Sequence, residues 1–212
     1  NRINLNIAKD QNTGDGKDRL ISIENVMAGG GNDVVIGTKA ANSLNGQNGN
    51  DVLNGQLGND VINGGSGRDT AVFSNRKNRI NLNSTKWQKT GDGRDRLISI
   101  ECVNAGGGND VVTGNKASNV LNGQAGHDVL SGAMGNDTLN GGAGWDTAAF
   151  SGRSNRINLN TTKWQNTGDG RDRLISIENV NAGSGNDFVT GNRFANMLSG
   201  QNGRDVLNGG GG

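Results

Sequence analysis

The chain has 212 residues, of which 31% are hydrophobic and 3% aromatic, and its formal net charge is +1. Glycine, asparagine and aspartate make up 90 residues, whereas proline and tyrosine are absent. This composition excludes a conventional globular core of this size, a collagen triple helix and a highly charged disordered chain. The single Cys102 excludes a disulfide framework and a thiolate zinc site, and no apolar run is long enough to span a membrane.

The sequence consists of a 77-residue repeat. The hexapeptide Asn1–Asn6 returns at Asn78–Asn83 and again at Asn155–Asn160. The repetition divides the chain into copy one (1–77), copy two (78–154) and a truncated copy three (155–212). We expect one continuous solenoid that is a fragment of a longer array of the same unit.

The segments outside the blocks of nine-residue units, at 1–27, 73–104 and 150–181, are predicted to continue the solenoid. Ile3–Asn6 alternates apolar and polar residues and predicts a strand. Thr13–Ile21 has the form of a nine-residue unit with Asp18 at its sixth position, and Ser22–Met27 reads as a shortened turn followed by a strand. We expect Asp18 to stack with Asp33.

Nine-residue units then follow in blocks at 28–72, 105–149 and 182–208. In the thirteen complete units, position 6 is Asp in ten and Asn in three, and position 4 is Gly in the same ten. Position 8 is always apolar. One apolar residue in nine cannot form an amphipathic helix, but it can be the inward residue of a short strand at positions 7–9. Positions 1–6 are then a glycine-rich turn.

Two such units make one 18-residue coil, and stacked coils give an all-β fold with two parallel sheets around a thin core. In this arrangement Asp33, Asp51 and Asp69 stack on one edge, and Asn42 and Asp60 on the other. Carboxylates about 5 Å apart repel each other by roughly 0.8 kcal/mol in water and about 3 kcal/mol at an effective dielectric near 20. Calcium, which takes six to eight carboxylate and carbonyl oxygens, is the cation that suits such an edge.

The units resemble the RTX (hemolysin-type) calcium-binding nonapeptide G-G-x-G-x-D-x-U-x. The segments between the blocks resemble the C-terminal repeat domain of serralysin-type secreted proteases. The resemblance implies a right-handed parallel β-roll that holds several Ca²⁺ ions and is decorated once in each copy of the 77-residue repeat. It also implies that each ion lies between two successive turns of one edge, bound by carbonyls of positions 1 to 4 and by two position 6 Asp.

Carried over, this pattern gives the candidate calcium ligands of each copy. In copy one they are Gly29, Gly31 and Asp33 with Gly46, Asn48 and Asp51, and Gln47, Gly49 and Asp51 with Gly64, Ser66 and Asp69. In copy two they are Gly106, Gly108 and Asp110 with Gly123, Ala125 and Asp128, and Gln124, Gly126 and Asp128 with Gly141, Ala143 and Asp146. In copy three they are Gly183, Gly185 and Asp187 with Gly200, Asn202 and Asp205. The second edge adds Gly55, Leu57 and Asp60, then Gly132, Met134 and Asp137, and the upstream Asp18, Asp95 and Asp172.

The second unit of each block departs from the family pattern. Asn42, Asn119 and Asn196 stand where Asp is expected. Sites that pair these residues with Asp60 or Asp137 are expected to be weaker or empty.

The family resemblance implies a non-catalytic module that stays unfolded inside a bacterium, leaves through a type I secretion channel and folds on extracellular calcium. Metal-linked folding agrees with a chain that has no disulfides. A structural repeat of an adhesin or surface layer is the alternative. No Ser-His-Asp set and no histidine cluster indicates an active site, and the absence of a threonine row argues against ice binding.

The segments between the blocks are basic and carry two equivalent tryptophans. Trp87 follows Lys86, and Trp164 follows Lys163. They indicate either a face for an anionic polysaccharide or cell surface, or solubilising charge over a thin core, and we favour the second. No nucleic-acid partner is expected.

Overall fold

The computed structural model describes residues 1–212 as strands and turns without a helix. It therefore contains no long apolar helix of the kind that crosses a bilayer. The chain forms two compact units, unit one at Asn1–Asn104 and unit two at Ala105–Gly212.

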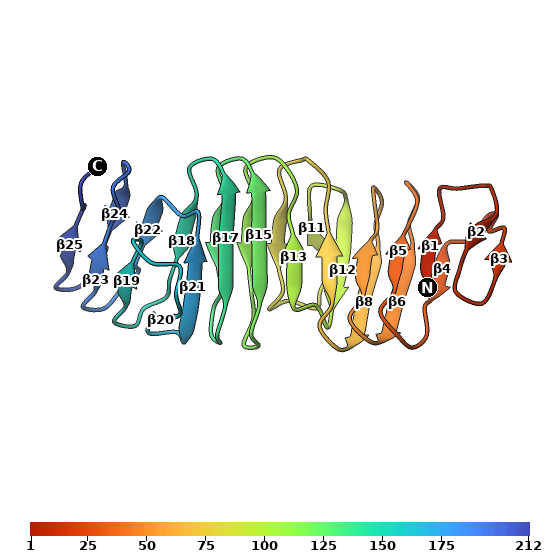
Figure 1. Ribbon diagram of the computed structural model, residues 1–212, viewed down its shortest axis with the longest axis horizontal. Helices are drawn as coiled ribbons and strands as arrows, with labels where there is room; N and C mark the ends of the chain where they lie inside the picture. Colours follow the sequence, from red (N-terminus) through yellow and green to blue (C-terminus); the bar gives the residue numbers. More distant parts are fainter. The chain divides into compact units, whose positions relative to one another are not determined.

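Unit one consists of strands that pair mostly in parallel (Figure 1). Its strands are β1 (Arg2–Asn4), β2 (Gln11–Asn12), β3 (Lys17–Asp18), β4 (Asn25–Met27), β5 (Val34–Ile36), β6 (Ser43–Asn48), β7 (Val52–Asn54), β8 (Val61–Ser66), β9 (Thr70–Val72), β10 (Arg79–Asn81), β11 (Gln88–Lys89), β12 (Arg94–Ile98) and β13 (Cys102–Asn104). One sheet has the order β1-β5-β7-β9-β13, and the other has the order β4-β6-β8-β12. The short strand β11 joins β12 antiparallel, and β2 and β3 form a separate hairpin.

The register confirms the predicted 18-residue coil. Val34 pairs with Val52, and Val52 pairs with Thr70. Across the segment between the blocks, paired residues lie more than 18 positions apart in the sequence. Val61 pairs with Arg96, and Thr70 pairs with Cys102. The roll thus continues through this segment, and the additional residues leave it as a hairpin before the chain returns to register.

The core of unit one consists of the apolar residues at the middle of each short strand. Val35, Leu53, Ala71 and Val103 are completely buried in one sheet, and Leu44 is completely buried in the other. Their flanking strand residues are only partly buried. Alternation in a strand points successive side chains to opposite faces, so one inward residue per strand is enough to fill a core that is a single side chain thick.

Unit two repeats this design. Its strands are β14 (Val111–Thr113), β15 (Val120–Ala125), β16 (Val129–Ser131), β17 (Thr138–Ala143), β18 (Thr147–Ala149), β19 (Arg156–Asn158), β20 (Gln165–Asn166), β21 (Arg171–Ile175), β22 (Asn179–Asn181), β23 (Phe188–Thr190), β24 (Met197–Ser199) and β25 (Val206–Asn208). The parallel orders are β15-β17-β21, β14-β16-β18-β22-β24 and β19-β23-β25, and β20 joins β21 antiparallel.

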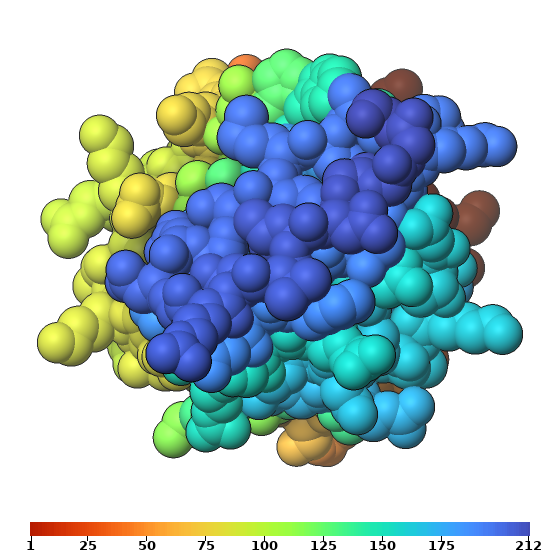
Figure 2. All heavy atoms as spheres, turned by 90° about the vertical axis from the view of Figure 1, so that its left-hand side faces the viewer, coloured from red at the N-terminus to blue at the C-terminus, as the bar shows by residue number.

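The C-terminal end of unit two is open. Figure 2 looks onto this end, where the last residues of the chain face the viewer. Leu207, the middle residue of β25, is 44% exposed, whereas Val189, with which it pairs one coil earlier, is completely buried. Burial of the inward residue therefore requires a coil on each side.

Equivalent strands of successive copies lie in opposite sheets. In unit one, β4 and β13 are related by the 77-residue repeat, yet β4 pairs with β6 and β13 with β9. In unit two, β15 and β24 are related in the same way, yet β15 pairs with β17 and β24 with β22. A strand and its turn make half a coil, and each half coil takes the chain from one sheet to the other. One copy therefore contains an odd number of half coils.

Candidate metal sites

The position 6 aspartates of unit one form a buried ladder on one edge of the roll. The backbone N–H of Asp33 donates to Oδ1 of Asp51 at 2.8 Å, and that of Asp51 donates to Oδ1 of Asp69 at 2.8 Å. All three side chains are at most 1% exposed. The expected stacking of these three residues is confirmed, and a backbone donor on the adjacent coil fixes each carboxylate.

A second ladder runs along the other edge. The N–H of Asn42 donates to Oδ1 of Asp60 at 2.7 Å, and the N–H of Asp60 donates to Oδ1 of Asp95 at 2.9 Å. The prediction that Asp18 stacks with Asp33 is wrong. Asp18 is exposed and accepts the hydroxyl of Thr13, while Asp33 accepts the N-terminal ammonium of Asn1.

Unit two contains the same ladders. Each backbone N–H donates to Oδ1 of the next position 6 carboxylate over 2.7–3.0 Å, in the pairs Asp110–Asp128, Asp128–Asp146, Asn119–Asp137, Asp137–Asp172 and Asp187–Asp205. The structure therefore places the predicted aspartates of all three copies in one geometry, apart from the exposed Asp18.

In eight of the ladder carboxylates the second oxygen has no hydrogen-bond donor. It is inaccessible to solvent and unpaired in Asp33, Asp51, Asp60, Asp69, Asp128, Asp137, Asp146 and Asp187. A buried polar atom without a partner costs free energy, and buried carboxylates are normally paired or bound to a cation. Eight such atoms with the same geometry indicate a repeated cation site.

Backbone carbonyls converge on the unpaired oxygens. A Cβ built on Gly46 would lie 2.1 Å from Oδ2 of Asp51 and 2.7 Å from the carbonyl oxygen of Gly64, which is position 1 of the next turn on that edge. In unit two, a Cβ built on Gly123 would likewise lie 2.1 Å from Oδ2 of Asp128 and 2.7 Å from the carbonyl oxygen of Gly141. Carboxylate and carbonyl oxygens from two successive turns therefore surround a small space, which is the donor set that calcium prefers.

No group of three or more His, Cys, Asp or Glu side chains that could hold a metal occurs among residues 1–212. A cation on these edges must therefore take most of its ligands from the backbone. Such a ligand set suits calcium, whereas zinc sites are built mainly from thiolate and imidazole side chains.

Burial raises the pKa of the ladder carboxyls. Desolvation raises the pKa of Asp60 and of Asp137 to about 7, although the N–H donors of Asn42 and Asn119 partly oppose it. Desolvation also raises the pKa of Asp51, Asp69, Asp95, Asp128, Asp146 and Asp172. In the absence of a cation, these edges therefore favour proton uptake.

The second turn of each block is closed by an asparagine. Asn42 Oδ1 accepts the N–H of Thr38 at 2.6 Å, and its Nδ2 donates to the carbonyl of Glu24 at 3.2 Å. Asn196 makes the same two hydrogen bonds, from Asn192 at 2.7 Å and to Glu178 at 2.8 Å. An amide can donate and accept at once, whereas a carboxylate only accepts, so these turns are satisfied without a cation.

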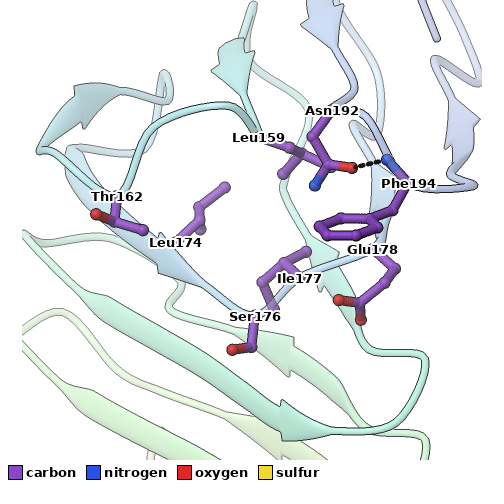
Figure 3. Close-up of a pocket in the computed structure, with 8 residues that line it drawn as sticks. All are labelled: Leu159, Thr162, Leu174, Ser176, Ile177, Glu178, Asn192 and Phe194. Atoms are coloured by element: carbon purple, nitrogen blue, oxygen red, sulfur yellow. Dashed lines mark hydrogen bonds between the residues drawn. The ribbon is translucent and has the colours of Figure 1, made fainter. Parts of the chain in front are cut away.

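The backbone of these turns also differs from that of the other ten. Positions 2 and 4 have no positive φ at Thr38 and Ala40, whereas Gln47 and Gly49 in the next turn have φ of 75° and 127°. In the third such turn, Phe194 takes position 4 and its N–H donates to Asn192 Oδ1 at 2.9 Å (Figure 3). Its ring lines a cavity of about 260 Å³.

Sequence reasoning missed the residues that end the ladders. The N–H of Asp69 donates to Oε2 of Glu101 at 3.0 Å, and the N–H of Asp146 donates to Oε2 of Glu178 at 2.9 Å. The hydroxyl of Thr90 donates to Oδ2 of Asp95 and caps the second ladder. The sequence does contain a signal for the two glutamates. Each lies immediately before a three-residue strand, and Asp occupies this same position in the nonapeptides.

The comparisons with known proteins agree with this geometry. The family model of the RTX calcium-binding nonapeptide repeat matches residues 27–62, 36–71, 104–139, 135–149 and 181–212, which together make up more than half of the chain. No curated protein matches the sequence significantly. The matched ranges contain the three blocks of nonapeptides, except residue 72, and the buried aspartates at their turns. The chain belongs to the RTX calcium-binding nonapeptide repeat family and is a calcium-binding β-roll.

Proposed function

We propose that this β-roll folds when calcium binds between successive turns, and that it does so outside a bacterial cell after export through a type I secretion channel. The observation that carries the first part is the set of eight buried carboxylate oxygens without a hydrogen-bond donor. Because the unfolded chain has no such converging oxygens, the free energy of calcium binding becomes free energy of folding. The second part rests on membership of the RTX family.

We assign the ions to steps between two position 6 aspartates. These steps are Asp33 to Asp51, Asp51 to Asp69, Asp110 to Asp128, Asp128 to Asp146 and Asp187 to Asp205. The steps from Asp60 to Asp95 and from Asp137 to Asp172 have the same ladder geometry, and we add them as candidate sites. The steps that begin at Asn42 and Asn119 are not assigned an ion, because these amides already hold their own turns.

Far-UV circular dichroism during a calcium titration from EDTA tests this function. We expect a cooperative transition from coil to β-structure that magnesium does not reproduce. Asp51→Asn removes a carboxylate shared by two steps and should raise the calcium midpoint by about tenfold, which corresponds to the loss of a charged ligand. Asp10→Asn, at an exposed position outside the ladders, is the matched control and should leave the midpoint unchanged.

A spectrum that is already β-rich in EDTA and indifferent to calcium would contradict folding on calcium. Equal midpoints for Asp51→Asn and Asp10→Asn would contradict the assignment of ions to the position 6 ladder. The export route is tested separately, by following secretion from a bacterium with and without a type I channel.

A structural role in an extracellular scaffold is the second candidate. The observation that favours it is the continuous strand pairing through the segment between blocks, where Thr70 pairs with Cys102 and Val61 with Arg96. A module with this property can extend a roll by whole copies. The mass of the intact secreted protein tests this role, because many further copies would support a scaffold and a single additional catalytic domain would contradict it.

A further inference from the structure

A small surface pocket that contains a tryptophan and an arginine recurs once in each unit. In unit one it is lined by Asn59, Trp87 and Arg94, and in unit two by Asn136, Trp164 and Arg171. The two cavities have volumes of about 180 and 170 Å³. The residues correspond one to one across the 77-residue repeat, so the same local fold builds both pockets. We call them the Trp–Arg pockets.

Backbone hydrogen bonds fix the walls of each pocket. Trp87 immediately precedes β11, which pairs with β12 so that Lys89 lies opposite Arg94. The backbone N–H of Arg94 donates to Oδ1 of Asn59 at 2.9 Å, and that of Arg171 donates to Asn136 at the same distance. The hairpin is therefore tied to a nonapeptide turn, and the pocket is preorganised in the folded roll.

The tryptophan rings face solvent instead of filling the core. Trp87 and Trp164 are each 46% exposed, whereas the inward residues of the strands are completely buried. A half-exposed indole beside a cavity offers a flat apolar face together with an N–H donor. The interpretation that the sequence favoured for this segment, solubilising charge over a thin core, does not account for an exposed aromatic ring.

Cationic side chains line the surface beside the ring in unit two and have no carboxylate partner. In unit two the pocket adjoins a groove of about 540 Å³ lined by Thr162, Lys163, Trp164, Arg171 and Arg173. None of these three cations forms an ion pair.

Arg173, the last of these three cations, is also oriented by a backbone carbonyl. Arg173 Nε donates to the carbonyl of Thr162 at 2.9 Å, and Arg96 in unit one makes the same bond to Thr85. Its terminal amino groups are left to bind an anion. The nearby carboxyls of Asp169 and Asp172 are buried, so the exposed charge at the groove is positive.

We propose that the Trp–Arg pockets bind uronate or sulfated sugar units of an anionic polysaccharide. The indole face would stack on the apolar face of a sugar ring, and the arginines would bind its carboxylate or sulfate. The arrangement favours a glycan over a nucleic acid, because single strands bind to successive aromatic platforms on strongly basic surfaces. Here each pocket contains one tryptophan, and the net charge of the chain is +1.

Copy one supplies a natural comparison. It has Asp10 at the position of Trp87 and Lys17 at the position of Arg94. Both residues are exposed. Copy one therefore lacks the aromatic platform and places a negative charge there, so we infer that it does not bind the polysaccharide.

Binding of defined oligosaccharides to the calcium-loaded chain tests this proposal. The probes are oligogalacturonate and heparin oligosaccharides, with dextran as the neutral glycan and oligothymidylate as the nucleic acid, measured by calorimetry and tryptophan fluorescence. We expect the double variant Trp87→Asp/Trp164→Asp, which carries the residue of copy one, to bind at least one anionic oligosaccharide about tenfold or more weakly than the parent.

Trp145→Asp is the matched control, because Trp145 is 51% exposed but lines neither Trp–Arg pocket. It should bind like the parent chain. Trp87→Ala/Trp164→Ala should also lose affinity, which separates the missing ring from the added charge. The calcium transition in circular dichroism should be the same in all variants, so a failure of calcium-linked folding would be seen separately.

Three results would overturn the proposal. They are no binding of either anionic oligosaccharide by the parent chain, an equal loss of affinity in Trp145→Asp, and tighter binding of oligothymidylate than of the anionic glycans. The last result would identify the pockets as a nucleic-acid surface instead.

Discussion

Asp and Asn at position 6 differ by one functional group, and this difference separates two kinds of turn. Asp51 uses one oxygen for a backbone donor and leaves the other buried without one. Asn42 has its oxygen bonded to Thr38 and its nitrogen bonded to Glu24. The first turn needs a cation and the second does not, so each block contains a turn that is closed without calcium.

Exchange of this asparagine for aspartate tests the distinction. Asn42→Asp removes the donor to the carbonyl of Glu24 and adds a charge, so the free energy of unfolding in calcium should fall by about 1–3 kcal/mol. The number of bound ions should not rise, because Thr38 and Ala40 lack the left-handed backbone of the other turns. Urea unfolding and the calcium stoichiometry measure both effects.

Asn50→Asp is the control for this exchange. Asn50 is exposed, and its Oδ1 accepts the N–H of Arg68 at 2.8 Å, a role that a carboxylate keeps. The control should change the unfolding free energy by less than about 0.5 kcal/mol. A more stable Asn42→Asp variant that binds an additional ion would show instead that the turn can convert.

At the scale of the element, the turn between two strands is determined by contact between successive coils. Gly49 has a φ of 127° and lies directly against the carbonyl of Gly31 on the preceding coil. Gly67 stands in the same relation to Gly49. Position 4 is therefore glycine for two reasons, the backbone angle and the close approach of a carbonyl that points along the stack.

An alanine at this position should disrupt the turn. In Gly49→Ala the new methyl group would lie 1.9 Å from the carbonyl oxygen of Gly31. We expect a loss of at least about 2 kcal/mol in the free energy of unfolding, from strain at positive φ together with the clash. Gly30→Ala is the control, because its Cβ would meet nothing within 4 Å and its φ is not positive. Equal stability of the two variants would contradict this account of the turn.

At the scale of the whole molecule, the buried carboxyls link stability to pH. Burial raises the pKa of Asp60 and Asp137 to about 7, well above the value of about 4 expected in an unfolded chain. A raised carboxyl pKa means that the folded state takes up protons more readily than the unfolded state. The resulting stabilisation is fully present below about pH 4 and is lost as the pH rises to about 7.

The calcium-free chain should therefore gain β-structure on acidification. In EDTA, the far-UV β signal should increase between about pH 8 and pH 5, because protons neutralise the ladders. In calcium the dependence reverses, since protons compete with the ion and the calcium midpoint should rise as the pH falls. Circular dichroism at several pH values measures both trends, and a β signal in EDTA that falls on acidification would contradict the first.

The sequence predicted the periodic parts of the fold and of the site. The 18-residue coil, the inward residue at position 8 and the ladder of Asp33, Asp51 and Asp69 follow from a period that every unit repeats. The roles of Glu101 and Thr90 and the exposed position of Asp18 could not be predicted in this way. They depend on how the non-periodic segments return to register, over the longer steps from Val61 to Arg96 and from Thr70 to Cys102.

The odd number of half coils in each copy gives the array a parity. Because β4 and β13, or β15 and β24, exchange sheets from one copy to the next, a feature carried once per copy alternates between the two sides of the roll. Loss or gain of a single copy by recombination would move every equivalent strand of the following copies to the opposite sheet. A change by two copies would leave each of these strands in its original sheet. Selection on a one-sided surface would therefore favour rearrangement in pairs.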